Sequence, residues 1–361
     1  MGSNLVERVK RLMTPWPEVR PDTFILWEPC SKSHGEIVPG YARYLRDLGF
    51  DVLVLMTPAR LDEGLFARFD PTGIRHGGLS QRQIRRFVQR PEIRQAAGIL
   101  VTTAGKLPDG PDGAVDLARV FGPTRPDRVL LVEHDARPRI DRGAWDPQTI
   151  TLRTLDYKGA RSVVVNPHDF GTVRHGPRNG DRTVFVMVGA LRAKRGNAPL
   201  VYQTAERLIA GGWRDFEIRV IGKPGRDPVP DALRDHVVPL GRLPFDRLYD
   251  EVEAADFLLT SFQADNPDHD FYRTGGTSGA FQLAYGFAKP ILLQEAFARL
   301  TRFNATNALV YGDDDGLMGA MARAIDMDAG TYAALQAGME ATATAIYESS
   351  LVNLRGLACD G

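Results

Sequence analysis

The chain is poor in cysteine, in net charge and in long apolar runs. Its 361 residues include two cysteines, Cys30 and Cys359 near opposite ends, so neither a disulfide framework nor a C-x-x-C pair is present. This usage fits a reduced, cytoplasmic setting. No segment has the length and apolarity of a signal peptide or a membrane-spanning helix. The 45 basic residues balance 45 acidic ones, which excludes the basic footprint of a nucleic-acid-binding protein.

Several short motifs are also missing. Neither half of the chain has a G-x-G-x-x-G fingerprint after its first predicted strand, and no G-x-x-x-x-G-K-[ST] phosphate loop occurs. No His, Cys and Asp residues have the spacing of metal ligands. These absences speak against a hydride-transferring enzyme and a P-loop NTPase, and we expect neither a cofactor nor a metal.

What the chain does contain is an alternation of apolar, β-branched runs with segments of helical periodicity. The runs in the first half are 23–27, 52–56, 98–102, 129–132 and 162–165, and the second half has runs at 184–188, 216–221, 257–260 and 291–293. Helices are expected between them, for example over 36–49, 198–210, 244–253 and 277–288. The alternation predicts an α/β fold with two doubly wound, Rossmann-like domains.

The length and one loop-rich stretch predict the domain boundaries. At about 100–200 residues per domain, the chain is long enough for two domains. Residues 166–182 are rich in Pro, Gly and Asn and predict a linker between domains 1–165 and 183–330. The Ala-rich segment 331–361 is helix-prone, and packing back on the first domain is one arrangement open to it.

The segment 5–13 is amphipathic, with three apolar residues on one face and three basic residues nearby. Such a face suits peripheral contact with an anionic membrane surface. A capping helix packed on its own domain is the simpler interpretation for so short a segment.

A glycine-rich turn at 275–279 is the most informative local motif. Gly275, Gly276 and Gly279 surround Thr277 and Ser278 at the start of an apolar helix. The unpaired N–H groups, the positive dipole end and the two hydroxyls of such a helix start can hold a diphosphate. The alternative is an ordinary Ser/Thr N-cap in a tight turn.

The first loop of the second half, 189–197, brings cations to the same sheet edge. Arg192 and Arg195 follow the strand that ends before Gly189, and Arg can grip phosphate oxygens through two parallel hydrogen bonds. We therefore expect Gly189, Arg192 and Arg195 at the diphosphate. A solvated turn explains Lys194 better.

The order of these segments resembles the GT-B glycosyltransferases, above all the C-terminal half of the bacterial family 4-like enzymes that build polysaccharides. The matching segments are VNPHDFG (165–171), FVMVGALRAKRGN (185–197), FEIRVIG (216–222), PLGRLPFDRLYDEVEAADFLLTSF (239–262) and TSGAFQLAYGFAKPILL (277–293). The first half matches less tightly, through 33–55 and 130–136. The resemblance implies two domains that face each other across a cleft, with the acceptor on the first and the nucleotide sugar on the second. It implies transfer of a sugar from a nucleotide diphosphate-sugar to a saccharide or lipid-linked acceptor in polysaccharide or envelope assembly.

One departure from that family concerns carboxylates. Many retaining members carry two glutamates eight positions apart, and the corresponding positions here are Gly275 and Leu283. Asp268, Asp270 and Glu295 are nearby acids that can replace the pair, although solvated loop positions explain each equally well. Weaker candidates for contact with the donor sugar or nucleoside are Gly222, Lys223 and Arg242.

An inverting transferase also needs a base on the domain that faces the donor. His34 and Glu36 follow the first predicted strand, and Asp135 follows a later one, so all three are candidates for the carboxyl edge of the first sheet. His34 suits the role because its ordinary pKa lies near neutral pH.

Other functions remain open for the same fold. A protein that binds nucleotide but has lost turnover would explain the missing glutamate pair. A sugar-nucleotide epimerase or hydrolase would act on the donor without an acceptor. A two-lobed solute-binding protein is disfavoured, since no export signal is found.

Overall fold

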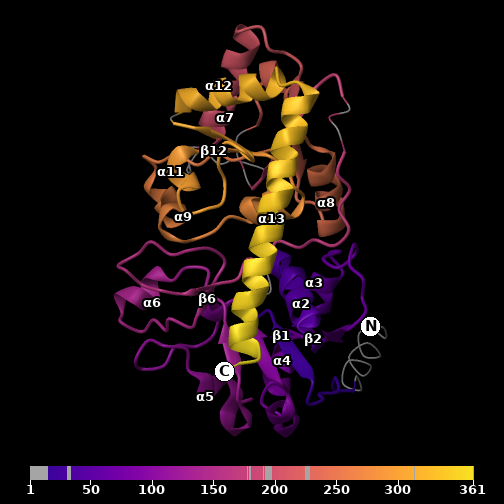
Figure 1. The fold of residues 1–361 in the computed structure, drawn as a ribbon, viewed down its shortest axis with the longest axis vertical. Helices are drawn as coiled ribbons and strands as arrows, with labels where there is room; N and C mark the ends of the chain where they lie inside the picture. Colours follow the sequence, from indigo (N-terminus) through magenta and orange to yellow (C-terminus); the bar gives the residue numbers. More distant parts are fainter. Residues whose placement is uncertain are drawn as a thin grey trace, which may run out of the picture.

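A computed structural model describes residues 15–360, apart from 31–33, 177, 179, 190, 192–196, 224–227 and 313. Two lobes are stacked along the long axis of the molecule, each built around a parallel sheet (Figure 1). The predicted fold class, α/β with two Rossmann-like domains, is confirmed. The amphipathic segment 5–13 lies outside the described residues.

The first sheet has five parallel strands in the order β3-β2-β1-β4-β5. They are β1 (Thr23–Trp27), β2 (Asp51–Met56), β3 (Ile74–Gly78), β4 (Gly98–Val101) and β5 (Val129–Leu131). The helices of this domain are η1 (Gly35–Ile37), α2 (Val38–Asp47), α3 (Pro58–Leu61), α4 (Gln81–Phe87), η2 (Pro91–Gln95), η3 (Ala104–Lys106), α5 (Leu117–Phe121), η4 (Gly122–Thr124) and α6 (Arg137–Asp141).

Beyond β5 the chain forms a small second sheet from β6 (Ile150–Thr151) and β7 (Val163–Val164). A single bridge between Val132 and Ile150 joins it to the end of β5. The run 162–165 is therefore a strand, but it pairs with β6 instead of entering the five-stranded sheet.

The second domain has six parallel strands in the order β10-β9-β8-β11-β12-β13. They are β8 (Thr183–Val188), β9 (Phe216–Ile221), β10 (Val237–Gly241), β11 (Phe257–Leu259), β12 (Ile291–Gln294) and β13 (Ala308–Tyr311). The helices are α7 (Asn197–Ala210), η6 (Asp231–Leu233), α8 (Phe245–Ala254), η7 (Pro267–His269), α9 (Asp270–Thr274), α10 (Gly279–Gly286), α11 (Glu295–Ala298) and α12 (Asp314–Ile325).

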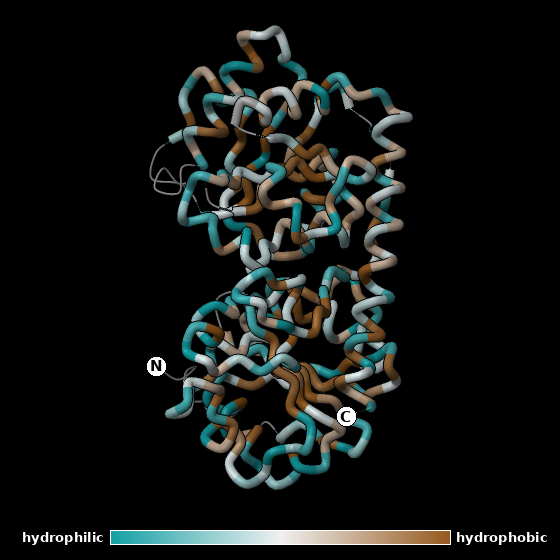
Figure 2. The backbone as a smooth tube through the Cα atoms, turned by 60° about the vertical axis from the view of Figure 1, so that its left-hand side comes forward, coloured by the Kyte–Doolittle hydropathy of each residue, from teal (hydrophilic) through white to brown (hydrophobic). Residues whose placement is uncertain are grey.

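The apolar runs lie inside each lobe, as the hydropathy colouring shows (Figure 2). All five residues of β1 are buried because helices cover both faces of the sheet. Phe24 points toward the core on the α2 side, and its neighbour Ile25 joins the core on the α4 side. This two-sided burial explains why the central strands have almost continuous apolar sequences.

The last helix, α13 (Ala329–Ala358), runs along both lobes (Figure 1). Met339 belongs to a core of the second domain, and Leu354 belongs to a core of the first. Near its end, the Asn353 side chain donates a hydrogen bond to the Val164 carbonyl at 2.9 Å. The helix therefore ties the two domains together on one side of the molecule.

The start of the segment 166–182 is firmly held. His168 is buried, and its ring nitrogens lie 3.1 Å from the Asn166 carbonyl and 3.0 Å from the Ala343 carbonyl in α13. Burial lowers the pKa of His168 to about 4. Phe170 is buried in a core of the second domain. Both side chains serve the packing of the two domains.

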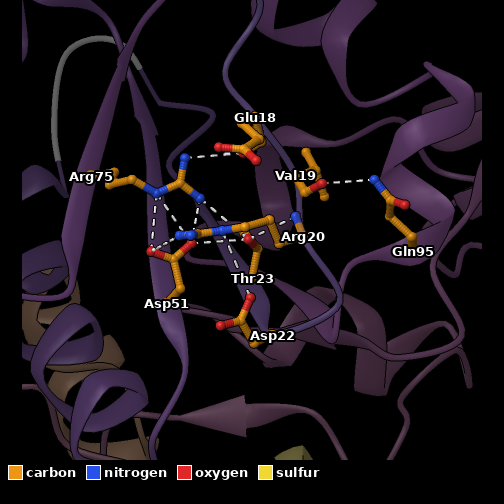
Figure 3. A network of polar contacts seen from close by, with 8 residues as sticks. All are labelled: Glu18, Val19, Arg20, Asp22, Thr23, Asp51, Arg75 and Gln95. Atoms are coloured by element: carbon orange, nitrogen blue, oxygen red, sulfur yellow. Dashed lines mark hydrogen bonds and ion pairs between the residues drawn. The ribbon is translucent and has the colours of Figure 1, made fainter.

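Charged side chains at the amino ends of β1, β2 and β3 form a network (Figure 3). Asp51 accepts hydrogen bonds from Arg75 Nε at 3.0 Å and from the Thr23 hydroxyl at 2.9 Å, and it pairs with Arg20 at 3.0 Å. The hydrogen bonds from Arg75, above all, lower the pKa of Asp51 to about 2. The network joins three strands at the edge far from their carboxyl ends.

We expect Asp51→Asn to lower the free energy of unfolding by about 1.5–3 kcal/mol at neutral pH, since it weakens charge-assisted hydrogen bonds. The folded-state pKa near 2 lies below the ordinary value of 3.8, so the contribution is present above about pH 4 and is lost as pH falls toward 2. Urea denaturation of both proteins between pH 7 and pH 3 measures this. A difference that does not shrink below pH 4 would show that the carboxylate charge is not its source.

Candidate functional site

A cavity of about 430 Å³ lies between the two domains. His34, Glu36, Arg60 and Glu63 line it from the first domain. The second domain contributes three glycines and two basic residues: Gly189, Gly222, Gly279, Lys223 and Arg242. It also contributes an apolar wall, made of Val188, Ile221, Leu243, Phe245, Leu248, Tyr249 and Leu283. Gly189 and Gly222 follow β8 and β9 directly, and His34 lies in the loop after β1, so the cavity lies where the carboxyl ends of both sheets meet.

A smaller cavity of about 220 Å³ adjoins it in the second domain and shares Val188 and Gly189 with it. Ser261 and Phe262, which follow β11, line its other side together with Tyr272 and Ser278. Strands β8 and β11 are neighbours, and the strand order changes direction between them. Such a switch point is where doubly wound sheets bind their ligands.

A larger cavity, of about 620 Å³, lies at the opposite edge of the same sheet. Val184, Asp256 and Lys289 line it, and all three stand at the amino ends of strands. Its position makes it a poor candidate for the reaction despite its size.

The start of α10 separates the cleft cavity from the smaller one. In the described part of the chain, no acceptor is found for the backbone N–H groups of Thr277, Ser278 and Gly279. The Ser278 hydroxyl caps the helix by accepting a hydrogen bond from the Ala280 N–H at 3.3 Å. The turn is therefore an N-cap with three consecutive free donors, and Ser278 lines the smaller cavity while Gly279 lines the cleft cavity, which suits an anion.

Two glycines shape this turn. Gly275 has φ +137°, and a Cβ there would lie 2.5 Å from the Leu155 side chain of the first domain. A Cβ on Gly276 would lie 2.2 Å from the Phe271 ring. Both glycines are thus required by close packing, and two of the next three residues, Ser278 and Gly279, line the cavities.

His34 occupies an unusual position at the cleft. Its backbone is left-handed, with φ +63°, and its ring lies 4.2 Å from the ring of His134. Burial, together with the nearby charges of Lys106 and Arg60, lowers the pKa of His34 below its ordinary value of 6.5. The ring is therefore neutral at pH 7 and has a free nitrogen that can accept a proton.

His134 holds a fixed orientation behind His34. Its Nε2 lies 2.9 Å from the Thr102 carbonyl, which places a proton on that nitrogen. Burial lowers the pKa of His134 to about 4. The pair is thus a neutral, rigid surface on the first-domain side of the cleft.

The two predicted carboxylates of the first domain differ in placement. Glu36 reaches across the cleft: its Oε1 lies 3.8 Å from where a Cβ on Gly279 would be. Asp135 instead forms two hydrogen bonds with Arg137, at 2.9 and 3.0 Å, and does not line the cleft cavity. Its neighbour Glu133 is buried and pairs with Arg139 at 3.1 Å.

Some of the residues predicted to contact the donor line the cleft cavity, and others do not. Gly222, Lys223 and Arg242 line the cleft cavity, and Arg242 pairs with Glu63 of the first domain at 3.2 Å. Asp270 pairs with Arg273 outside both cavities, and Glu295 is an exposed residue at the start of α11. Arg192, Lys194 and Arg195 lie outside the described residues.

The residues that join the domains across the cleft were not among those predicted from the sequence. Arg60 is buried beside Glu63, and its guanidinium lies 5.5 Å from the centre of the Phe245 ring in the second domain. The Phe245 N–H donates to the Glu63 carbonyl at 2.6 Å. Nothing in the local sequence PARLDEG signals these contacts, because they depend on residues about 180 positions away.

No helix in the described part of the chain combines the length and apolarity needed to cross a membrane. Neither a known protein family nor a curated protein sequence matches this chain.

Solved structures do match it over nearly its whole length. AviGT4, a glycosyltransferase involved in avilamycin A biosynthesis, is 14% identical with a TM-score of 0.55, covering 94% of this chain and 98% of that one. HepE of Anabaena, solved with UDP-glucose, is 13% identical with a TM-score of 0.59, covering 93% and 99%. WaaG, a glycosyltransferase involved in lipopolysaccharide biosynthesis, is 12% identical with a TM-score of 0.51, covering 94% and 100%. At these identities the likeness shows the fold, which is that of the GT-B glycosyltransferases.

Proposed function

We propose that this protein is a glycosyltransferase that moves a sugar from a nucleotide diphosphate-sugar to a saccharide or lipid-linked acceptor. The observation that carries the proposal is the start of α10, where three consecutive N–H groups have no acceptor among the described residues and where Ser278 and Gly279 line two adjoining cavities at the cleft. The matched fold, which includes a protein solved with UDP-glucose, supports the same substrate class. Polysaccharide or envelope glycan assembly is the process in which we place it.

In this proposal the nucleoside and the anomeric carbon of the donor both face the cleft cavity, which His34 lines. The diphosphate lies at the N–H groups of Thr277, Ser278 and Gly279, between the cavities, where the helix dipole favours negative charge. The apolar wall that includes Leu243 and Leu283 suits the nucleoside. Lys223 and Arg242 add positive charge to the same cavity.

His34 is the base in this proposal. Its neutral ring nitrogen takes the proton from an acceptor hydroxyl while that oxygen forms a bond to the anomeric carbon. The bond from the anomeric carbon to the diphosphate breaks, and the diphosphate leaves with the electron pair, stabilised by the α10 donors. Asp135 is the weaker candidate, because Arg137 occupies both of its carboxylate oxygens.

Gly279→Asp is expected to weaken nucleoside diphosphate binding about tenfold to a hundredfold, because it adds negative charge at the proposed phosphate site. A carboxylate at the first position of a helix stabilises the helix, so folding should be preserved. Calorimetry with UDP, ADP, GDP and dTDP measures the binding.

Gly279→Asn is the matched control, since it has the same shape without the charge, and it should lose much less affinity. If none of the four nucleotides binds the wild type, or if the aspartate variant binds as well as the wild type, the donor site is wrongly placed.

A further inference from the structure

A separate cavity of about 390 Å³ lies in the first domain, on the α4 side of the sheet. Trp27 and Pro29 line it at the end of β1, and Lys106 and Leu107 line it just after β4. Strands β1 and β4 are neighbours at the point where the strand order of the first sheet changes direction. By the rule that governs doubly wound sheets, this is the ligand-binding edge of the first domain.

The rim of this cavity is cationic. Arg85 of α4, Lys106 of η3 and Arg119 of α5 all line it, and none of its described lining residues is acidic. Within the described residues, none of the three side chains forms an ion pair. This differs from the neighbouring arginines Arg137 and Arg139, which are both paired with carboxylates.

Hydrogen bonds link the segments that carry Arg85 and Arg119. The Gln89 side-chain amide donates hydrogen bonds to the carbonyls of Arg119 and Val120, at 3.3 and 3.1 Å. These bonds join the end of α4 to α5 across the cavity. The Trp27 indole N–H is buried in the wall and has no acceptor among the described residues. A buried donor without an acceptor is costly unless a ligand uses it, and the three cations at the rim are exposed, so the same ligand can reach them.

The cavity is also close to the proposed base. The His34 ring lies 4.2 Å from the His134 ring, and His134 contacts the carbonyl of Thr102, which follows β4 four residues before the lining residue Lys106. A ligand held at the rim can therefore extend toward His34.

We propose that this cavity binds a phosphate group carried by the acceptor, with Arg85, Lys106 and Arg119 as its cationic partners. The inference rests on the proposed function and adds the chemical class of the acceptor. Three unpaired cations match a phosphate dianion, and Arg and Lys both bind phosphate oxygens. A volume of about 390 Å³ is in the range of small-ligand sites and accommodates one sugar ring. The donor does not compete for this cavity, since its own site is on the second domain.

The test is calorimetry of the full chain with glucose 1-phosphate, glucose 6-phosphate and glucose, and with phosphatidate vesicles. Each titration is repeated in saturating UDP, which blocks the donor site. We expect phosphate-bearing probes to bind in both conditions and glucose to bind at least tenfold more weakly. Stronger binding of the sugar phosphates assigns the phosphate to a saccharide acceptor, and stronger binding of the vesicles assigns it to a lipid-linked one.

The double variant Arg85→Gln/Arg119→Gln should lose about tenfold to a hundredfold in affinity for the phosphate-bearing probe. Arg86→Gln is the matched control, because Arg86 is an exposed arginine of α4 that does not line the cavity. Equal affinity of the double variant and the wild type, or binding of glucose as tight as that of its phosphates, would overturn the proposal. Failure of every phosphate-bearing probe would do the same. Because no probe in this assay needs turnover, these results do not depend on whether the nucleotide binds at α10.

Discussion

Replacing His34 with alanine is expected to lower the rate of sugar transfer by about 10²–10⁴-fold, the usual contribution of a general base. Donor binding should change little, since the diphosphate is held by α10. The lowered pKa of His34 means that kcat/KM of the wild type should be level at neutral pH and fall on the acid side, below pH 6.5. Steady-state rates of nucleoside diphosphate release between pH 5 and pH 9 measure both effects.

His76→Ala is the control for this experiment, because His76 is an exposed histidine of β3 in the same domain that does not line the cleft cavity. Its turnover should stay close to that of the wild type. Undiminished turnover in His34→Ala would exclude His34 as the base. Loss of nucleotide binding in that variant would make His34 a donor contact instead.

Gly338→Ala is expected to lower the free energy of unfolding by about 2–4 kcal/mol, one of the largest single-residue effects in the chain. A Cβ on Gly338 would lie 2.0 Å from the Thr306 carbonyl oxygen, so α13 must move away from the second domain. That movement also strains the hydrogen bond from Asn307 to the Thr342 hydroxyl, at 2.8 Å. Urea denaturation midpoints report the loss.

Gly356→Ala provides a matched control in the same helix. A Cβ there meets nothing within 4 Å, so the change should stabilise the helix by about 0.5–1 kcal/mol through helix propensity. If the two substitutions had the same effect on unfolding, close packing of α13 on the second domain would not be a major source of stability.

The sequence predicted the central strands and the edge strand β5, and it missed the other edge strand of the first sheet and both edge strands of the second. β1, β2 and β8 are flanked by strands and covered by helices, so each has a run of apolar residues that can be recognised locally. Of the strands not predicted, β3, β10 and β13 are edge strands, and β6 has only two residues. Because edge strands are partly exposed, they can contain polar residues and glycine, as in IRHGG of β3. Such a strand lacks the continuous apolar run by which a strand is recognised in the sequence.

The same limit applies to the candidate site. The turn at 275–279 could be predicted because its glycines, hydroxyls and helix start are adjacent in sequence. The pairing of Asp135 with Arg137 is also local, yet the sequence alone does not tell which acid near the strand end stays unpaired. Arg60 and Glu63 contact residues of the second domain that lie about 180 positions away in the sequence. No local sequence pattern predicts such contacts.

The most direct test of the central claim is a crystal structure of the protein with the nucleoside diphosphate that binds best in calorimetry. We predict that the diphosphate lies within hydrogen-bond distance of the N–H groups of Thr277, Ser278 and Gly279, with the nucleoside in the cavity between the domains. A diphosphate bound elsewhere, for example at the cationic cavity of the first domain with the start of α10 empty, would contradict the proposed donor site and the function built on it.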